Sequence, residues 1–282
     1  MTRVMKNPVM KNPETTGGAP ARTPAKAGRS ATRSTATGSS ATARLVRTEL
    51  TLLRRDPLTL TFVFVFPVVT MLIIGGSFGT KPTPGFENTN PSHWYVASYL
   101  TVVIAATGLI TIPVHLAAYR ERGVLRRFAV AGFPRWSFAL AQLVVGLGAI
   151  AAASAMLLAV AAPVYGVPHL HQPARVLAAF VLGSVAFVSI GVLLGSVLPS
   201  ARAAQATGLI LFFPSFLIGA GGPPPKVMGS AIRGFAGYLP LTRLTEAVRD
   251  PWLGIGSATA SLIAVAVLAA VAAALAIRRS AL

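Results

Sequence analysis

The segment 117–136, "AAYRERGVLRRFAVAGFPRW", concentrates charge between two long apolar segments. Its charged side chains are five arginines and one acid: Arg120, Arg122, Arg126, Arg127, Arg135 and Glu121. Residues 118–128 can form about two to three helical turns, with Gly123 as a weak point. On that helix Leu125 and its apolar neighbours face a membrane or a protein groove, while the arginines face outward. A positive anchor at the membrane surface explains only the number of arginines in this segment. Docking on a protein partner explains both the charge of the segment and its helical shape.

Other patterns that carry chemistry are scarce. The chain has no cysteine, which excludes disulfides, thiol catalysis and cysteine-ligated metals. No phosphate-binding pattern G-x-x-x-x-G-K-[ST] occurs, so this chain does not hydrolyse ATP by that route. His169 and His171 give only two imidazoles, which alone make a weak metal site. We expect no catalytic residue, no cofactor-binding residue and no metal ligand in this chain.

The composition is typical of a membrane protein. Hydrophobic residues make up 54% of the 282 residues and charged residues 11%, and the mean hydropathy is +0.67. A soluble domain is about a quarter charged. The net charge of +18 comes from 25 basic and 7 acidic residues. The basic residues lie in the tail, the loops and the segment ends without a nucleic-acid-binding motif. That distribution favours orientation of membrane spans over nucleic-acid binding.

Hydrophobic segments long enough to cross a bilayer predict an all-α polytopic membrane protein, since about 20 apolar residues per helix are needed. The six expected spans are residues 58–79, 93–118, 136–162, 174–198, 203–221 and 257–277. Residues 1–43 are rich in Ser, Thr, Ala, Gly, Pro and basic residues, which predicts a disordered basic cytoplasmic tail. The transmembrane domain is expected over residues 44–282.

The alternation of basic and non-basic loops places both termini in the cytoplasm. The segment 222–256 conflicts with this orientation, because it should be external and yet carries Lys226, Arg233, Arg243 and Arg249. Its prolines, glycines and second amphipathic stretch predict a re-entrant or interfacial helix hairpin between spans five and six. Thr242 is the expected cap of that amphipathic helix. Its expected apolar side consists of Leu241, Leu244, Ala247 and Val248.

The segment "ARLVRTELTLLRRDP", residues 43–57, predicts an amphipathic helix in the membrane plane, ahead of the first span. Arg54 and Arg55 belong to its basic face, and Glu49 lies near the edge of the apolar face. Asp56 followed by proline predicts an N-cap for the first span. Two interpretations stand side by side: a membrane-entry helix held by its arginines, or a lever packed beside the arginine segment.

Three motifs in order resemble the permease of type-2 ABC transporters, the group that includes daunorubicin-resistance-type drug exporters and polysaccharide and lipid exporters. They are "ELTLLRRDPLTL" with "FPVV", "YRERGVLRRF" with "GFPRW", and "GYLPLTRLTEAVRDPWLG". The resemblance covers about residues 44–279 and leaves out the basic tail.

This resemblance implies a coupling helix that docks on a separate ATPase subunit. The docking residues would be Arg120, Glu121, Arg122, Gly123, Leu125 and Arg126. The helix before span one would be the connecting helix, with Glu49, Arg54, Arg55 and Asp56. Spans two and five would line a translocation path in a dimer, and Thr107, Thr111, Phe212, Phe213 and Phe216 would face that path. For any one polar residue inside a span, contact between helices is the simpler explanation.

The expected function is export of a hydrophobic or amphiphilic substrate, such as a drug, a lipid or a lipid-linked glycan, across the bacterial inner membrane. The permease would act as a homodimer or with a similar permease, bound to two copies of an ATPase that holds ATP and magnesium. A channel or secondary transporter acting alone is one alternative. A proton-driven carrier needs an intramembrane acid or histidine, and the spans offer only His115 near one end. A scaffold that recruits a cytosolic protein or anionic lipid is the other alternative.

Overall fold

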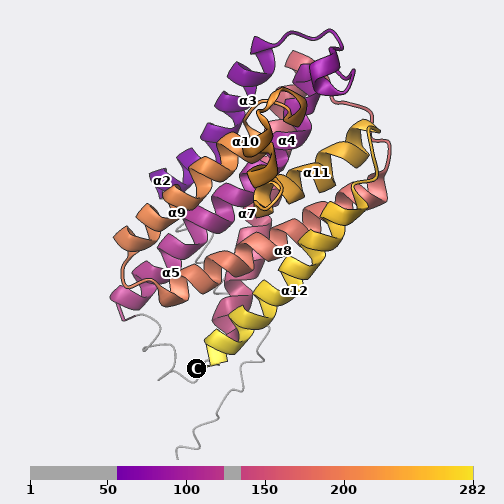
Figure 1. Ribbon diagram of the computed structural model, residues 1–282. Coiled ribbons are helices and arrows are strands. Elements are labelled where there is room, and N and C mark those ends of the chain that lie inside the picture. Colours follow the sequence, from indigo (N-terminus) through magenta and orange to yellow (C-terminus); the bar gives the residue numbers. More distant parts are fainter. Residues whose placement is uncertain (1–55, 124–134, 282) are drawn as a thin grey trace, which may run out of the picture. The chain divides into compact units, whose positions relative to one another are not determined.

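The computed structural model describes residues 56–123 and 135–281, and these residues are helical apart from short connections (Figure 1). Their long helices are α3 (Phe66–Ser77), α4 (Pro91–Ala106), α5 (Ile112–Glu121), α7 (Arg135–Tyr165), α8 (Pro173–Val197), α9 (Ala201–Ser215), α11 (Pro240–Leu253) and α12 (Thr259–Ala281). The shorter ones are α2 (Pro57–Thr59), η1 (Leu60–Val65), η2 (Pro84–Phe86), η3 (Thr107–Thr111), η4 (Phe216–Ala220), η5 (Pro225–Val227) and α10 (Ser230–Ala236). No strand forms within the described ranges, so the predicted all-α class is confirmed.

Six helical segments of the described residues are long and apolar enough to cross a membrane, as predicted. They are Leu60–Ser77, Pro91–Glu121, Leu140–Tyr165, Pro173–Val197, Ala201–Ala220 and Thr259–Arg279. Their ends differ from the predicted ends by only a few residues. Successive spans run in opposite directions (Figure 1). Asp56, Glu121, Ser200 and the C-terminal end of α12 therefore lie at one end of the bundle, here called the termini end. The connection between α9 and α12 lies at the opposite end, here called the loop end.

In two of the six spans a wide π-helical segment ends two residues before a proline. The segment η1 precedes Pro67, and η3 precedes Pro113. Proline lacks an N–H and its ring collides with the carbonyl four residues earlier. One extra residue in the preceding turn removes that collision, and it lets the helix continue across the membrane instead of ending.

The second span, made of α4, η3 and α5, lies at the centre of the bundle. In its most apolar part 89% of the residues are buried, against 28% in spans one, five and six. Contacts with α3, α8, α9 and α11 surround it. The approach of α8 is especially close, because a Cβ on Gly191 would collide with the Gly108 carbonyl oxygen of η3. A Cβ on Gly108 would collide with the Phe187 carbonyl in turn. Small residues at this crossing allow two backbones to touch.

The connection between spans five and six folds into a helix pair, α10 and α11, as the amphipathic pattern predicted. The predicted apolar residues Leu241, Leu244, Ala247 and Val248 are all buried, against α4, α8 and α12. The predicted cap at Thr242 is wrong. The N-cap residue is Leu239 and Pro240 occupies the first helical position, so Thr242 lies inside the first turn. Proline favours the first helical position because its fixed φ suits a helix and its missing N–H would have had no partner within the helix.

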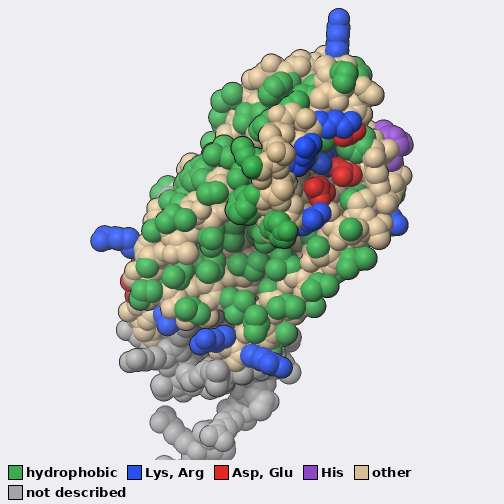
Figure 2. Space-filling view, viewed as in Figure 1, with side chains coloured by type: hydrophobic (Ala, Val, Ile, Leu, Met, Phe, Trp, Pro, Cys, Tyr) green, Lys and Arg blue, Asp and Glu red, His purple; other side chains and the backbone are tan. Residues whose placement is uncertain are grey.

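The flank of the bundle is mainly hydrophobic, and charged side chains gather toward its ends (Figure 2). Exposed large apolar residues occur on every span outside the central one, for example Ile73, Leu177, Ile210 and Ile263. Such a surface is stable in lipid but not in water. The predicted interfacial helix before span one lies outside the described residues.

Candidate functional site

The predicted docking segment begins as the last turn of the second span rather than as a separate helix. Arg120 and Glu121 are the final residues of α5, and the chain then turns at Arg122 and Gly123. Gly123 adopts a φ of 65° and donates its N–H to the Arg120 carbonyl at 3.1 Å, a turn that commonly ends helices. The weak point expected at Gly123 is therefore the helix end. Leu125 and Arg126 lie outside the described residues.

The Arg120 side chain contacts another span of its own chain. Its Nη1 donates to the carbonyl oxygens of Gly195 at 3.1 Å and Leu198 at 3.0 Å. These carbonyls belong to the C-terminal turn of α8, where carbonyls lack partners within the helix and a cation is favourable. Arg120 thus ties the end of span two to the end of span four. Glu121 and Arg122 are exposed beside it.

Asp56 joins the start of span one to span two at the same end. Its carboxylate accepts from the Thr59 N–H at 3.4 Å and the Thr59 hydroxyl at 2.8 Å, and it lies 2.8 Å from Nε2 of His115. Burial acts to raise the pKa of Asp56, but the bonds from His115 and Thr59 outweigh it and leave this pKa below its usual value. The predicted capping role of Asp56 is confirmed. The sequence did not reveal the contact with His115, because the two residues lie 59 positions apart. The other connecting-helix candidates, Glu49, Arg54 and Arg55, lie outside the described residues.

Four of the five candidate path residues are enclosed by their own chain. Thr107 and Thr111 lie in η3 and are 1% and 4% exposed. Phe212 and Phe216 stack with 5.8 Å between ring centroids and are also buried. Phe213 alone is partly exposed, at 38%. In this arrangement span five presents Phe213 outward, and a path along Thr107 and Thr111 would require neighbouring helices to separate.

The charged residues of the loop end are largely paired with acids. Lys226 pairs with Glu87, Arg243 with Glu246 at 3.4 Å, and Arg249 with Asp250 at 2.8 Å. These pairs offset three of the four basic charges that conflicted with the expected orientation. The sequence could not reveal the first pair, whose members are 139 residues apart.

The buried pair of Arg249 and Asp250 packs on an aromatic ring. The Arg249 guanidinium carbon lies 3.7 Å from the centre of the Trp94 ring, which allows a cation–π interaction. Burial raises the pKa of Asp250, and the neighbouring Arg249 only partly offsets that rise.

The imidazole of His171 contacts the protein backbone. Nδ1 of His171 lies 3.0 Å from the Trp252 carbonyl oxygen, which joins the turn before α8 to α11. The rings of His169 and His171 lie 5.1 Å apart. Among the described residues no group of three or more His, Cys, Asp or Glu side chains is arranged to hold a metal ion.

Six apolar spans, a helix pair at one end and a charged turn at the other define a multi-pass membrane protein. The family model described as "ABC-2 type transporter" matches residues 41–252. The chain belongs to this family and is the membrane-spanning permease subunit of an ABC transporter, a transport subunit that is not itself catalytic. Members of the family typically work with an ABC ATPase. A comparison with curated proteins gives no match.

Proposed function

We propose that this permease exports a hydrophobic or amphiphilic substrate with energy from a separate ABC ATPase. The substrate classes that fit are a drug, as in the daunorubicin-type group, a lipid or a lipid-linked glycan. The observation that carries the proposal is family membership together with the charged turn at the end of span two. ATP and magnesium bind the ATPase, since this chain has no phosphate-binding loop of the Walker type.

The coupling step is proposed to start at the segment 120–126, of which residues 120–123 are described. The exposed side chains of Glu121 and Arg122 bind the ATPase. Motion of that turn then reaches span four through Arg120, whose guanidinium bonds the end of α8. It reaches span one through His115 and Asp56. Three spans are thereby linked to a single surface turn.

The character of the spans supports an amphiphilic substrate. No Asp, Glu, Lys or Arg lies inside the six spans away from their ends. Hydroxyl and aromatic groups line the expected path, which suits a substrate with a large apolar part and does not suit a metal ion. We propose that two permeases, identical or similar, form this path between them, with two ATPase copies bound. The exposed ring of Phe213 is then the first candidate contact at their boundary.

The proposed setting is a bacterial inner membrane with the termini end in the cytoplasm. Under this orientation the arginine turn faces the ATPase and the helix pair α10–α11 faces outward. The expected basic tail, residues 1–43, lies outside the described residues.

Purification with the native partner tests the docking proposal. The tagged chain, solubilised from its own membrane in mild detergent, should retain an ATPase with a Walker-type loop in stoichiometric amount. Recovery of the chain alone under these conditions would favour a transporter that acts without an ATPase.

Charge reversal at Arg122 locates the docking surface. Arg122→Glu should insert normally but retain less ATPase and lose export, because it changes an exposed charge of the turn. Arg279→Glu, at another exposed position near the end of α12, is the matched control and should retain the ATPase. Equal retention by both variants would place the docking surface elsewhere. Arg120→Glu is a less specific probe, since Arg120 also holds the end of α8.

A further inference from the structure

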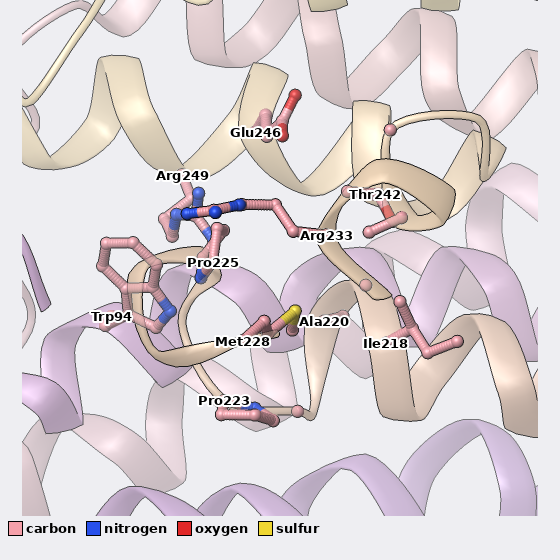
Figure 3. Close-up of a pocket in the computed structure, with 14 residues that line it drawn as sticks. Trp94, Ile218, Ala220, Pro223, Pro225, Met228, Arg233, Thr242, Glu246 and Arg249 are labelled. Carbon is pink, nitrogen blue, oxygen red and sulfur yellow. The ribbon is translucent and has the colours of Figure 1, made fainter. Parts of the chain in front are cut away.

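A small pocket at the loop end lies between span two, the end of span five and the helix pair (Figure 3). Its volume is about 60 Å³, which is room for a few water molecules or one small oxyanion. Trp94 of α4, Ala220 of η4, Arg233 of α10, and Thr242 and Arg249 of α11 all contribute to its wall. Segments far apart in the sequence therefore build it together.

Two guanidinium groups converge on this pocket. Figure 3 shows the Arg233 side chain reaching toward Arg249 and Trp94. Arg249 is held rigidly, because its Nε and Nη2 both bond the Asp250 carboxylate and its face lies on Trp94. It is only 5% exposed. A fixed, buried guanidinium is a preorganised hydrogen-bond donor.

Positive charge is in excess around the pocket. Asp250 balances Arg249, and the Glu246 carboxylate is used by Arg243 and by the Ser261 hydroxyl at 2.7 Å. The ion pairs formed by the described residues leave Arg233 without an acidic partner. Glu246 itself also lines the pocket, and Arg233 is an exposed residue, so the surplus positive charge beside the pocket is that of the Arg233 side chain.

A buried hydroxyl provides a second, independent indication of a ligand. Thr242 is 5% exposed and lines the same pocket. Its Oγ1 has no hydrogen-bond partner among the described residues. Buried polar groups are nearly always hydrogen-bonded, and an unsatisfied one costs free energy. A valine would have the same shape without the free-energy cost of an unpaired hydroxyl. The hydroxyl at this position therefore indicates a hydrogen-bond partner that enters the pocket.

We propose that this pocket binds a phosphate group, either free or as the head group of an anionic lipid. Arg233, Arg249 and Thr242 belong to two helices and offer donors from different directions. A tetrahedral oxyanion with several acceptor oxygens matches them better than a planar carboxylate. The Pro223, Ile218 and Met228 side chains form an apolar wall beside the donors, which suits a head group attached to a chain. The inference needs only the permease fold and does not depend on export or on the ATPase.

Binding to the purified full-length chain, without ATPase, tests the proposal. The probes are inorganic phosphate, glycerol phosphate and a short-chain phosphatidylglycerol, with short-chain phosphatidylcholine for comparison. Calorimetry and the rise in unfolding temperature report binding. Saturable binding of inorganic phosphate supports a site for the free ion, and binding of phosphatidylglycerol alone supports a site for the lipid head group.

Three variants connect any binding to this pocket. Arg233→Gln and Thr242→Val should each weaken binding about tenfold or more, as expected for loss of a hydrogen bond to a charged group. Lys81→Gln removes an exposed positive charge at the same end but outside the pocket, and it should bind as the unmodified chain does. Thr242→Val should unfold at the same temperature or higher in the absence of phosphate.

Two results would overturn the proposal. One is the lack of saturable binding by every phosphate-bearing probe. The other is an equal loss of affinity in Arg233→Gln and Lys81→Gln, which would mean that surface charge alone attracts the anion.

Discussion

Two arginines of the same turn, Arg120 and Arg122, have different roles. Arg120 holds the end of another span, and Arg122 is proposed to bind the ATPase. Both Arg120 and Arg122 are exposed, but the guanidinium of Arg120 also bonds two carbonyls at the end of α8. A count of arginines in the sequence cannot distinguish these roles, because the partner carbonyls lie 75 and 78 residues away.

Truncation of Arg120 should therefore lower stability, while truncation of Arg122 should not. Arg120→Ala removes both bonds and should cost about 1 kcal/mol of unfolding free energy, since the site is partly solvated. Arg122→Ala should change stability very little. Thermal unfolding of the two purified variants provides the comparison, and equal melting temperatures would contradict the structural role of Arg120.

The carboxylate of Asp56 predicts a pH dependence. Its folded-state pKa lies below its unfolded value of about 3.9, so its stabilising contribution is present above that value. The contribution is lost as the pH falls through the lower folded pKa. Asp56→Asn should thus be less stable than the unmodified chain at pH 6, and the difference should shrink below about pH 4. Unfolding temperatures measured between pH 7 and pH 3 test this, and a difference that stays constant would refute it.

At the scale of elements, α8 crosses η3 of the second span with the two backbones in close contact. A side chain on Gly191 would collide with backbone that cannot rotate away. Gly148, on α7, has open space in front of it.

The two glycines should respond differently to the same substitution. Gly191→Ala should destabilise the chain by about 1–3 kcal/mol, as overpacking does. Gly148→Ala should be neutral or slightly stabilising, because alanine favours the helix and nothing obstructs its methyl group. Unfolding measurements on the two variants in one detergent compare them. Equal stability would mean that α8 and η3 lie further apart than described.

The elements themselves were well predicted from the sequence because the signal that defines them is local. An apolar run such as residues 174–198 determines a span whatever its neighbours are. The amphipathic spacing of Leu241, Leu244 and Val248 likewise predicted the buried side of α11. The predicted cap at Thr242 was wrong because proline two residues earlier occupies the first helical position.

The contacts between elements were largely unpredictable, since they depend on which spans become neighbours. The contact of Asp56 with His115 and the pair of Lys226 with Glu87 join residues far apart in the chain. The small pocket at the loop end combines residues from span two, η4, α10 and α11. No local pattern in the sequence encodes such combinations. The burial of Thr107 and Thr111 could not be predicted either, because it depends on which helices surround span two.

At the scale of the whole molecule, the alternation of six spans makes the orientation testable with single cysteines. The natural chain has none, which leaves a clean background. Lys81 is exposed at the loop end and Arg278 is exposed near the end of α12.

Labelling from outside the cell should distinguish the two ends. A membrane-impermeant thiol reagent should modify Lys81→Cys in intact cells. Arg278→Cys should react only after permeabilisation, because the termini end is proposed to face the cytoplasm. The cysteine-free chain serves as the control. The opposite labelling pattern would invert the proposed orientation, and labelling of both would contradict six crossings.

The central position of the second span also has a consequence for how the protein is made. Synthesis proceeds from the N-terminus, so this helix enters the bilayer before α8, α9 and α11 exist to enclose it. Three of its hydroxyls are already satisfied within the helix, since Ser98 donates to the Trp94 carbonyl, Thr101 to Ser98 and Thr107 to Val103. The hydroxyl of Thr101 meets that of Thr245 at 2.8 Å only once α11 has been made. The apolar character of a helix that ends up almost wholly surrounded by protein is thus required by its interval in lipid during biogenesis as well as by its final apolar environment.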